Sequence, residues 1–283
     1  MTDRASRTAL AVATGRAVGL RDLHDPLAMR FLPAWQRRIA TRLRRIVTAG
    51  AGGEALVATT TAGLTTHAAL RMAAVDRAVV AAVEDGAGQV VVVGAGFDTR
   101  AWRLSVLGGL RVIEVDLPTI QAHKVARLAD LDPLADVSFV AADLATTSLD
   151  DALATSGHAV DVRTTWVWEA VAPYLPPAAV TSALEAMATR SSPGSHLVMT
   201  YAHPDLVGGP ALGRLLSPIA RGVFAGLGEP LLSLHTDDEI RAEAAGAGWT
   251  PRATTAVPDW ARAEDRSAPR SAFAAEHLLT ATR

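Results

Sequence analysis

The sequence predicts an α/β protein, in which a parallel β-sheet carries helices on both faces. Short runs of β-branched and aromatic residues alternate along the chain with segments of helical length. Each intervening segment is long enough to return the chain to the same edge of a sheet. The clearest strand, Gln89–Val93, is apolar on both faces, as central parallel strands are.

The N-terminal part of the chain is predicted to be helical. From Thr8 to Val83, alanine, leucine, valine and arginine recur without β-branched alternation, and turn residues interrupt them at 24–26 and 50–53. We therefore expect an N-terminal helical region over residues 1–83.

The α/β core is expected over residues 84–202. Five strand-like runs follow one another, at 89–93, 111–115, 137–140, 164–168 and 195–200. Segments of helical length lie between these runs, at 117–131, 148–155 and 178–189.

The chain after the fifth strand is rich in proline and glycine. Residues 203–233 are expected to form a lid insertion over a pocket, with a loose loop against the N-terminal helices as the alternative. Residues 234–283 are expected to complete the core. They begin with a helix that Thr236 caps, with Glu239 three residues later, and end with a strand pair at 249–257 and 272–280.

Composition excludes several classes of protein. With 27 basic and 29 acidic side chains the net charge is −2, which argues against a surface devoted to nucleic acid or anionic lipid. The absence of cysteine removes thiol nucleophiles, Cys-ligated zinc and disulfides, and no metal-binding pattern is visible. No run approaches the ~20 apolar residues of a membrane span, and no secretory segment precedes the helices. A cytoplasmic location is expected.

The strongest local signal is the turn Gly94-Ala95-Gly96, directly after the first strand. Two glycines let the backbone turn sharply and approach a ligand that a Cβ would exclude. Asp116 ends the second strand about twenty residues later, where an acid can accept both hydroxyls of an adenosine ribose. A tight strand-to-helix turn and a helix cap before Pro118 are the alternatives.

The residues beside the glycines favour one class of cofactor. A dinucleotide site has a third glycine and places a pyrophosphate at the helix N-terminus. Here Thr99 takes that position, and Asp98 brings a negative charge to the same place. Two carboxylates would repel a pyrophosphate but suit a cofactor with an ammonium and a sulfonium group. S-adenosylmethionine is that cofactor, and a nicotinamide dinucleotide is disfavoured.

These motifs resemble the leucine carboxyl methyltransferase family, which includes the protein phosphatase methyltransferase, many actinobacterial methyltransferases and tetracenomycin-type polyketide O-methyltransferases. The matching segments are Gly94–Leu104, Glu114–Pro118 with Lys124, Ala142–Leu144, Trp168–Leu175 and Thr200–Tyr201, with His24–Pro26 and Arg71–Asp76 upstream and Gly228–Pro230 downstream. The resemblance spans about residues 8–260. It implies a class I methyltransferase fold with a Rossmann-like sheet.

The resemblance also implies which residues contact S-adenosylmethionine. They are Arg71, Gly94, Gly96, Asp116, Asp143, Leu144 and Glu169. Arg71 would bind the cofactor carboxylate, with a charge on a helix surface as the alternative. Gly94 and Gly96 would pass under the methionine part of the cofactor.

The other four residues would contact the nucleoside and the reacting end. Asp116 would accept the ribose hydroxyls. Asp143 and Leu144 would receive the adenine, with a cap or turn role as the alternative for Asp143. Glu169, after the fourth strand, would face the amino-acid end of the cofactor and the methyl group.

Methyl transfer from a sulfonium is an in-line displacement, so the protein must place the acceptor oxygen and exclude water. A carboxylate acceptor needs no base, whereas a phenol or enol would benefit from one. The candidate base is His203, with His235 less favoured. Tyr174 and Tyr201 are candidates for orienting the acceptor. A solvated loop is the alternative for His203, and packing is the alternative for Tyr201.

The sequence thus predicts a metal-free, S-adenosylmethionine-dependent O-methyltransferase. Its acceptor would be a small-molecule hydroxyl or carboxyl group of polyketide-type secondary metabolism. No nucleic-acid or membrane partner is expected, and a homodimer is left open. Two departures from the family pattern, Ala170 in place of a usual glycine and Pro173 before Tyr174, lie beside the presumed acceptor pocket. A protein carboxyl methyltransferase and a non-methylating, cyclase-like relative are the alternatives.

Overall fold

The computed structural model describes residues 7–144, 146–205, 230–266 and 275–283. The chain divides into two compact units that alternate along the sequence. The first comprises Met1–Ala74, Asp205–Glu229 and Thr255–Glu276, and the second comprises Val75–Pro204, Pro230–Thr254 and His277–Arg283. The domain boundaries expected from the sequence stay a prediction.

The described part of the first unit is largely helical, as predicted for the N-terminal part of the chain. Its elements are α1 (Arg7–Val18), η1 (Pro26–Phe31), α2 (Ala34–Thr48), α3 (Ala51–Thr60), the first half of α4 (Leu64–Glu84) and α11 (Val257–Ala263). The predicted turn at 24–26 begins η1, because the carboxylate of Asp25 accepts hydrogen bonds from the first backbone N–H groups.

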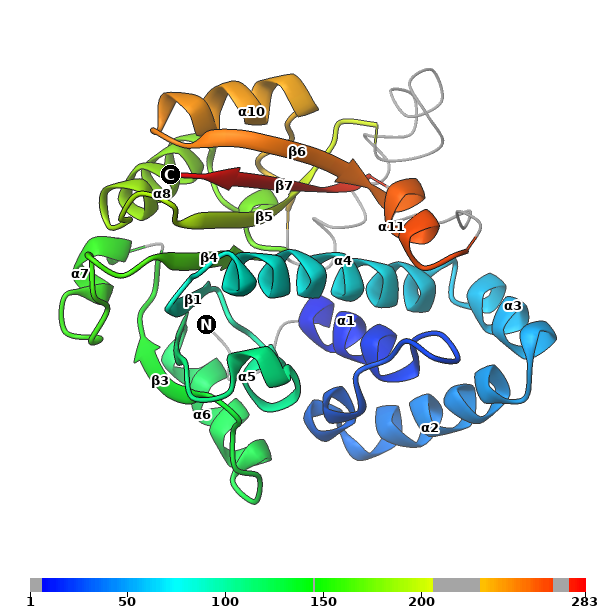
Figure 1. Cartoon of the computed structure of the whole chain (residues 1–283). Helices are drawn as coiled ribbons and strands as arrows, with labels where there is room; N and C mark the ends of the chain where they lie inside the picture. Colours follow the sequence, from blue (N-terminus) through cyan, green and yellow to red (C-terminus); the bar gives the residue numbers. More distant parts are fainter. Residues whose placement is uncertain (1–6, 145, 206–229, 267–274) are drawn as a thin grey trace. The chain divides into compact units, whose positions relative to one another are not determined.

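The second unit is built on a seven-stranded sheet of order β3-β2-β1-β4-β5-β7-β6. The strands are β1 (Gln89–Val93), β2 (Arg111–Asp116), β3 (Asp136–Ala141), β4 (Thr164–Trp168), β5 (His196–Ala202), β6 (Thr250–Ala256) and β7 (Glu276–Thr282). The first five strands pair in parallel. In Figure 1, β7 runs opposite to both β5 and β6. The sheet is therefore mixed, and the expectation of a parallel sheet holds for β1 to β5 only.

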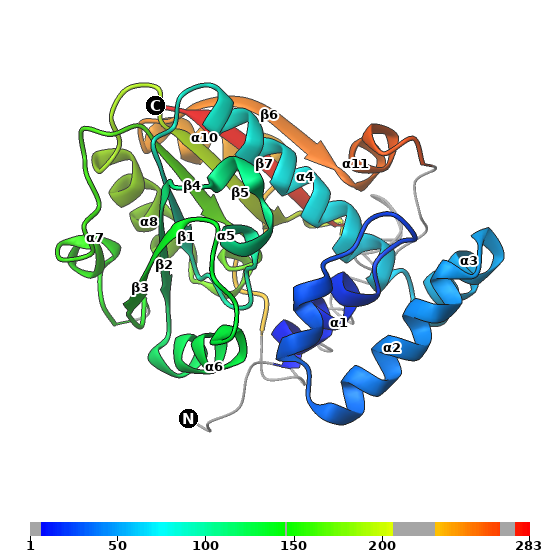
Figure 2. The same ribbon diagram turned by 60° about the horizontal axis from the view of Figure 1, so that its bottom comes forward.

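Helices cover both faces of this sheet, as predicted. The helices on one face are α7 (Leu149–Leu153), α8 (Pro177–Thr189) and α10 (Asp237–Gly246), whose apolar side chains join those of the strands in the core. The other face carries the second half of α4 with α5 (Arg100–Arg103), η2 (Ser105–Leu107) and α6 (Pro118–Leu128). The two sets lie on opposite sides of the strands (Figure 1 and Figure 2). A short turn of helix, η3 (Ala172–Tyr174), follows β4.

Side-chain alternation along β2 shows why both faces are occupied. Ile113 and Val115 enter the core beneath α7 and α8, so Glu114 between them points to the opposite face. There its carboxylate accepts a hydrogen bond of 2.5 Å from Lys124 of α6. The only lysine of the chain is thus a buried partner of this strand.

The predicted capping box at the start of α10 is present. The Thr236 hydroxyl accepts from the backbone N–H of Glu239 at 3.3 Å, and the Glu239 carboxylate accepts from the backbone N–H of Thr236 at 2.8 Å. This arrangement satisfies two N–H groups that would otherwise be unpaired at the helix end.

Parts of two predictions lie outside the described residues. These parts are residues 206–229 of the predicted lid, which include Gly228 and Glu229, and residues 272–274 of the predicted last strand. The strand expected at 272–280 is present as β7, but it begins only at Glu276.

No helix in the described ranges combines the length and the apolar character that a bilayer crossing requires.

Candidate active site

The turn after β1 forms a glycine cradle at the carboxyl edge of the sheet. Gly94 and Gly96 have φ values of 68° and 47°, in the left-handed region that glycine tolerates best. A Cβ added to Gly94 would lie 2.4 Å from Cγ2 of Val171, so this position has no room for a side chain. A Cβ on Gly96 would meet no atom nearer than the Gly94 oxygen at 4.0 Å. The space over Gly96 can therefore be filled by a ligand.

Asp116 closes one side of this cradle. Its carboxylate accepts from the backbone N–H of Gly96 at 2.5 Å and from that of Leu117 at 2.6 Å. Burial raises the pKa of Asp116, while the two backbone donors act against that rise. Each carboxylate oxygen keeps a second lone pair for a hydroxyl donor. The predicted glycines and the predicted ribose ligand are thus in direct contact, which fits the nucleoside of the cofactor.

A buried charge network lies on the same edge. The guanidinium of Arg100 donates to Asp76 and to Glu169, each at 2.7 Å, and also to Asp98. Arg103 pairs with Asp76 as well. Three carboxylates against two guanidinium groups leave one formal negative charge, which suits a cationic ligand.

The pairing of Asp98 corrects one step of the sequence interpretation. Asp98 was expected to present its charge to the ligand, but it is buried and bonded to Arg100. Burial works against both charged forms, yet their attraction holds the pKa of Asp98 below its ordinary value and raises that of Arg100. The negative character of the site comes from the whole network and from Asp116.

Sequence reasoning named none of Asp76, Arg103 and Arg100 as a site residue, and the most buried of the three is Arg100. It lies at the centre of three ion pairs and is 2% exposed. The available signal was its place two residues after Asp98, at the start of a helix that follows the glycine turn. An arginine there needs nearby acids if it is to be buried.

Ala170 follows Glu169 in a left-handed conformation, with φ of 57°. A glycine, which the family resemblance implies at this position, would adopt this conformation with less strain. The backbone N–H of Ala170 donates to the Thr200 hydroxyl at 2.8 Å and ties the end of β4 to β5. The Arg100 ion pair and this hydrogen bond together fix where Glu169 lies.

Arg71 lies in the first unit and is 4% exposed, so the alternative of a helix-surface charge is wrong. Its guanidinium donates to Glu276 at 2.6 Å, and Nε2 of His67 contacts the same carboxylate at 2.8 Å. Burial would raise the pKa of Glu276, but Arg71 and His67 lower it to about 2. The predicted contact of Arg71 with the cofactor carboxylate stays a prediction.

Asp143 and Leu144 follow β3. The Asp143 carbonyl accepts from the backbone N–H groups of Thr146 and Thr147, so its main chain forms a turn. Leu144 lines a cavity of about 320 Å³, together with the strand ends at Val93 and Trp168. This volume is within the range of small-molecule sites.

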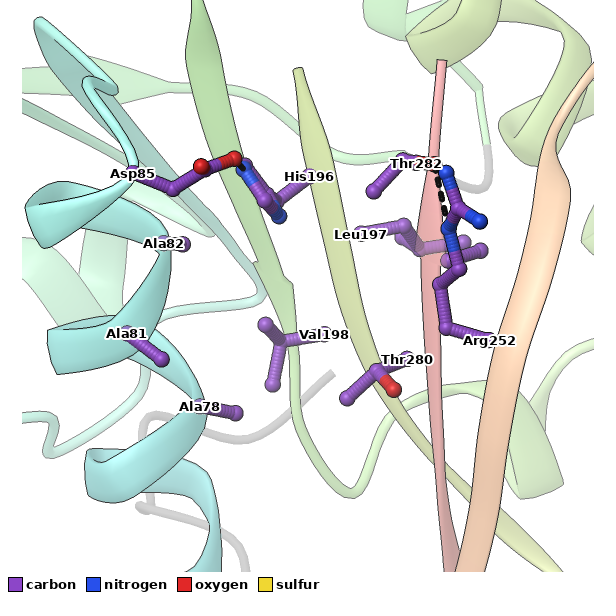
Figure 3. Close-up of a pocket in the computed structure, with 11 residues that line it drawn as sticks. Ala78, Ala81, Ala82, Asp85, His196, Leu197, Val198, Arg252, Thr280 and Thr282 are labelled. Carbon is purple, nitrogen blue, oxygen red and sulfur yellow. Dashed lines mark hydrogen bonds and ion pairs between the residues drawn. The ribbon is translucent and has the colours of Figure 1, made fainter. Parts of the chain in front are cut away.

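A second cavity of about 320 Å³ lies between α4 and strands β5, β6 and β7 (Figure 3). His196, at the amino end of β5, contacts Asp85 across it at 3.0 Å, and Arg252 donates to Thr282 at 2.9 Å. None of the predicted site residues lines this cavity.

The candidate acceptor residues gather around Asp237, the first residue of α10. Oδ1 of Asp237 accepts from the Tyr201 hydroxyl at 2.6 Å and lies 2.7 Å from Nδ1 of His277. The rings of His203 and His277 stack, with centroids 4.8 Å apart and planes at 13°. Sequence reasoning found Tyr201 and His203 but missed Asp237 and His277.

The remaining candidates make other side-chain contacts. Nε2 of His235 pairs with Glu243 at 3.0 Å. Tyr174 ends η3 and is half-buried. Burial, followed by the hydrogen bond to Asp237, raises the pKa of Tyr201, so its hydroxyl stays a neutral donor.

Comparison with known proteins defines the class of this protein. Residues 8–188 match the leucine carboxyl methyltransferase family, and the chain belongs to that family. The protein is thus an S-adenosylmethionine-dependent methyltransferase, as the sequence motifs predicted.

Two relatives carry the name "putative S-adenosyl-L-methionine-dependent methyltransferase". One, from Mycolicibacterium paratuberculosis, is 31% identical over 218 residues, which cover 73% of this chain and 67% of the relative. The other, from Mycobacterium avium, is 38% identical over 129 residues, which cover 45% of this chain and 42% of the relative.

Solved structures support the fold. A DUF574 family protein from Streptomyces avermitilis has a TM-score of 0.60 at 18% identity, with 93% of this chain and 98% of that chain covered. A protein from Thermobifida fusca, named a "putative methyltransferase", has a TM-score of 0.58 at 18% identity, with 99% of this chain and 96% of that chain covered. At these identities the likeness concerns the fold alone.

Proposed function

We propose that this methyltransferase transfers the methyl group of S-adenosylmethionine to an oxygen atom of a small molecule. The observation that carries the proposal is the open space over Gly96, bounded by the Asp116 carboxylate. When bound, the cofactor supplies a methyl group whose bond to sulfur breaks as the acceptor oxygen attacks, with the electron pair left on sulfur.

The chain's own residues would bind and orient. Asp116 would accept the ribose hydroxyls, and Asp143 with Leu144 would receive the adenine beside the cavity at the strand ends. Glu169, held by Arg100, would face the amino-acid end of the cofactor. The excess of carboxylates in the Arg100 network supports binding of a cation there.

The acceptor is proposed to be a hydroxyl or carboxyl group of a secondary metabolite of polyketide type. The resemblance to tetracenomycin-type O-methyltransferases motivates this choice. Metal-free transfer and a cytoplasmic location stay predictions.

The cofactor part is tested by calorimetry with S-adenosylhomocysteine. We expect binding by the unaltered protein and a loss of roughly 10- to 100-fold for Asp116→Asn, because a charge-assisted hydrogen bond contributes about 1.5–3 kcal/mol. Asp136→Asn is the matched control, since Asp136 is exposed at the opposite end of the neighbouring strand. Absence of heat with the unaltered protein contradicts the proposal.

The acceptor part is tested with host extracts, split into protein and small-molecule fractions and incubated with cofactor that carries a labelled methyl group. We expect the label in small molecules, with a mass gain of about one methylene. Label confined to protein bands would instead support the protein carboxyl methyltransferase.

A further inference from the structure

The cluster around Asp237 lies at the same edge of the sheet as the cradle. Parallel strands β1, β4 and β5 all end at this edge, and β7, which runs the other way, begins there (Figure 1). His277 is the second residue of β7, and Glu169 directly follows β4. The two strands are separated by β5 alone, so their axes lie roughly 10 Å apart. A small acceptor fits within that span.

The contact with Asp237 determines where the His277 imidazole carries its hydrogen. A carboxylate can only accept, so Nδ1 of His277 must donate across the 2.7 Å separation. In the neutral ring, Nε2 then holds the lone pair. Among the described residues, Nε2 of His277 has no hydrogen-bond partner. The ring is therefore prepared to accept a proton at Nε2.

The surroundings hold this pair in place. The rings of Tyr201 and His203, from β5 and its end, have centroids 5.7 and 4.8 Å from that of His277, and Glu276 precedes it on β7. From α10, Asp237 contacts His277, and Arg241 acts on Tyr201. Burial opposes ionisation of Asp237, but the Tyr201 and His277 hydrogen bonds keep its pKa below the ordinary value. The capping box that starts α10 fixes the backbone of Asp237.

We propose that His277 is the general base of the reaction, that Asp237 is its positioning residue, and that the acceptor is consequently a hydroxyl of the phenol or enol class. This inference rests on the proposed function. The acceptor oxygen bonds to the methyl carbon, the carbon–sulfur bond breaks with its electron pair left on sulfur, and the acceptor proton moves to Nε2 of His277. A carboxylate acceptor carries no proton at neutral pH and would therefore need no general base.

The first experiment measures the tautomer directly. In protein labelled with ¹⁵N at histidine, with the His277 signals assigned by comparison with His277→Gln, Nδ1 should carry the hydrogen and Nε2 the lone pair at pH 8. In Asp237→Asn this preference should weaken. A ring of His277 protonated at Nε2 would overturn the proposal, whatever the acceptor.

The second experiment compares turnover in host extracts. His277→Gln should lower the methylation rate by roughly 10²–10⁴-fold, and Asp237→Asn by at least about 10-fold, while the affinity for S-adenosylhomocysteine changes less than about twofold. A merely structural role of Asp237 would lower the rate without changing the tautomer measured in the first experiment.

The matched control is His196→Gln. His196 forms the same kind of pair, with Asp85, but at the opposite end of β5 (Figure 3), and we expect an unchanged rate. Products should be methyl ethers, which survive mild alkali. Methyl esters, or equal rates for His277→Gln and the unaltered protein, would overturn this inference and leave the proposed function intact. Failure of the unaltered protein to bind S-adenosylhomocysteine would instead contradict the proposed function.

Discussion

Ala170 and Glu114 each hold an unfavourable local state, one of the backbone and the other of a buried carboxylate. Ala170 holds a left-handed backbone beside Glu169. Glu114 is 1% exposed, and its Oε1 has no hydrogen-bond partner among the described residues. The sequence places an acid and a lysine in this region, but it cannot indicate that both are buried. That depends on which face of β2 the helix α6 covers.

Replacement of Ala170 by glycine should relieve backbone strain. A left-handed conformation costs a non-glycine residue roughly 1–2 kcal/mol, while the added freedom of glycine in the unfolded chain costs about 0.4–1 kcal/mol. We therefore expect Ala170→Gly to raise the free energy of unfolding by up to about 1 kcal/mol. Ala242→Gly, on the exposed side of α10, is the control. There the same exchange should lower the free energy of unfolding by about 1 kcal/mol. Equal losses in urea denaturation would contradict the prediction.

The stability of the protein should depend on the ionisation of Glu114. Burial, which outweighs the attraction of Lys124, raises the pKa of Glu114 to about 7. A raised folded-state pKa means that the stability from this group is present below about pH 4.5 and is lost as the pH rises through about 7. Between about pH 4.5 and 7, the free energy of unfolding of the unaltered protein should fall by on the order of 3 kcal/mol relative to that of Glu114→Gln.

Chemical denaturation at pH 5 and pH 8 checks this expectation. Glu84→Gln serves as the control for the loss of one carboxylate, because Glu84 is exposed at the end of α4. A flat difference for Glu114→Gln as well would show that Glu114 titrates normally.

At the scale of the element, the glycine turn and the strands around it were the most predictable parts. The five predicted strands of the core lie within two residues of β1 to β5. β1 and β4 are buried along their whole length, as central parallel strands are. The predicted last strand begins at Ala272, before β7, because an apolar run precedes Glu276 in the sequence. The first two residues of β7 are polar: Glu276 forms an ion pair with Arg71, and His277 contacts Asp237.

Gly96 offers a test of the cradle, with Gly109 as its control. Both glycines have positive φ, 47° and 74°, and a Cβ on either would meet no atom closer than 4 Å. Replacement of either glycine by alanine should therefore lower the free energy of unfolding by a similar amount, about 1 kcal/mol. Only Gly96→Ala should weaken S-adenosylhomocysteine binding, by about 10-fold or more, because its methyl group fills space meant for the ligand. Equal affinities in calorimetry would count against the cradle.

At the scale of the whole molecule, the order of the motifs along the sequence predicts the class of protein, but it does not predict which residues meet in the site. The Arg100 network joins residues from Asp76 to Glu169, and the Asp237 cluster joins Tyr201 to His277. Local sequence patterns contain no information about such distant pairings. The sheet order brings them together, and for that reason Asp237, His277 and Arg100 escaped the sequence analysis.

Ligand binding should stabilise the folded molecule by mass action. At a concentration 100 times its dissociation constant, S-adenosylhomocysteine should raise the free energy of unfolding by about 2.7 kcal/mol. NADH at the same concentration should have no effect, because the carboxylates of the Arg100 network and Asp116 oppose a diphosphate. Thermal denaturation with each ligand checks this, and stabilisation by NADH alone would contradict the electrostatic argument.

The position of β7 has a consequence for biosynthesis. This strand lies between β5 and β6, although both neighbours precede it in the sequence. While the polypeptide is being made, β5 and β6 therefore present open hydrogen-bonding edges that only the later insertion of β7 can close. A nascent chain stalled before Glu276 would expose those edges to other chains, and it would also lack the imidazole on which the proposed proton transfer depends.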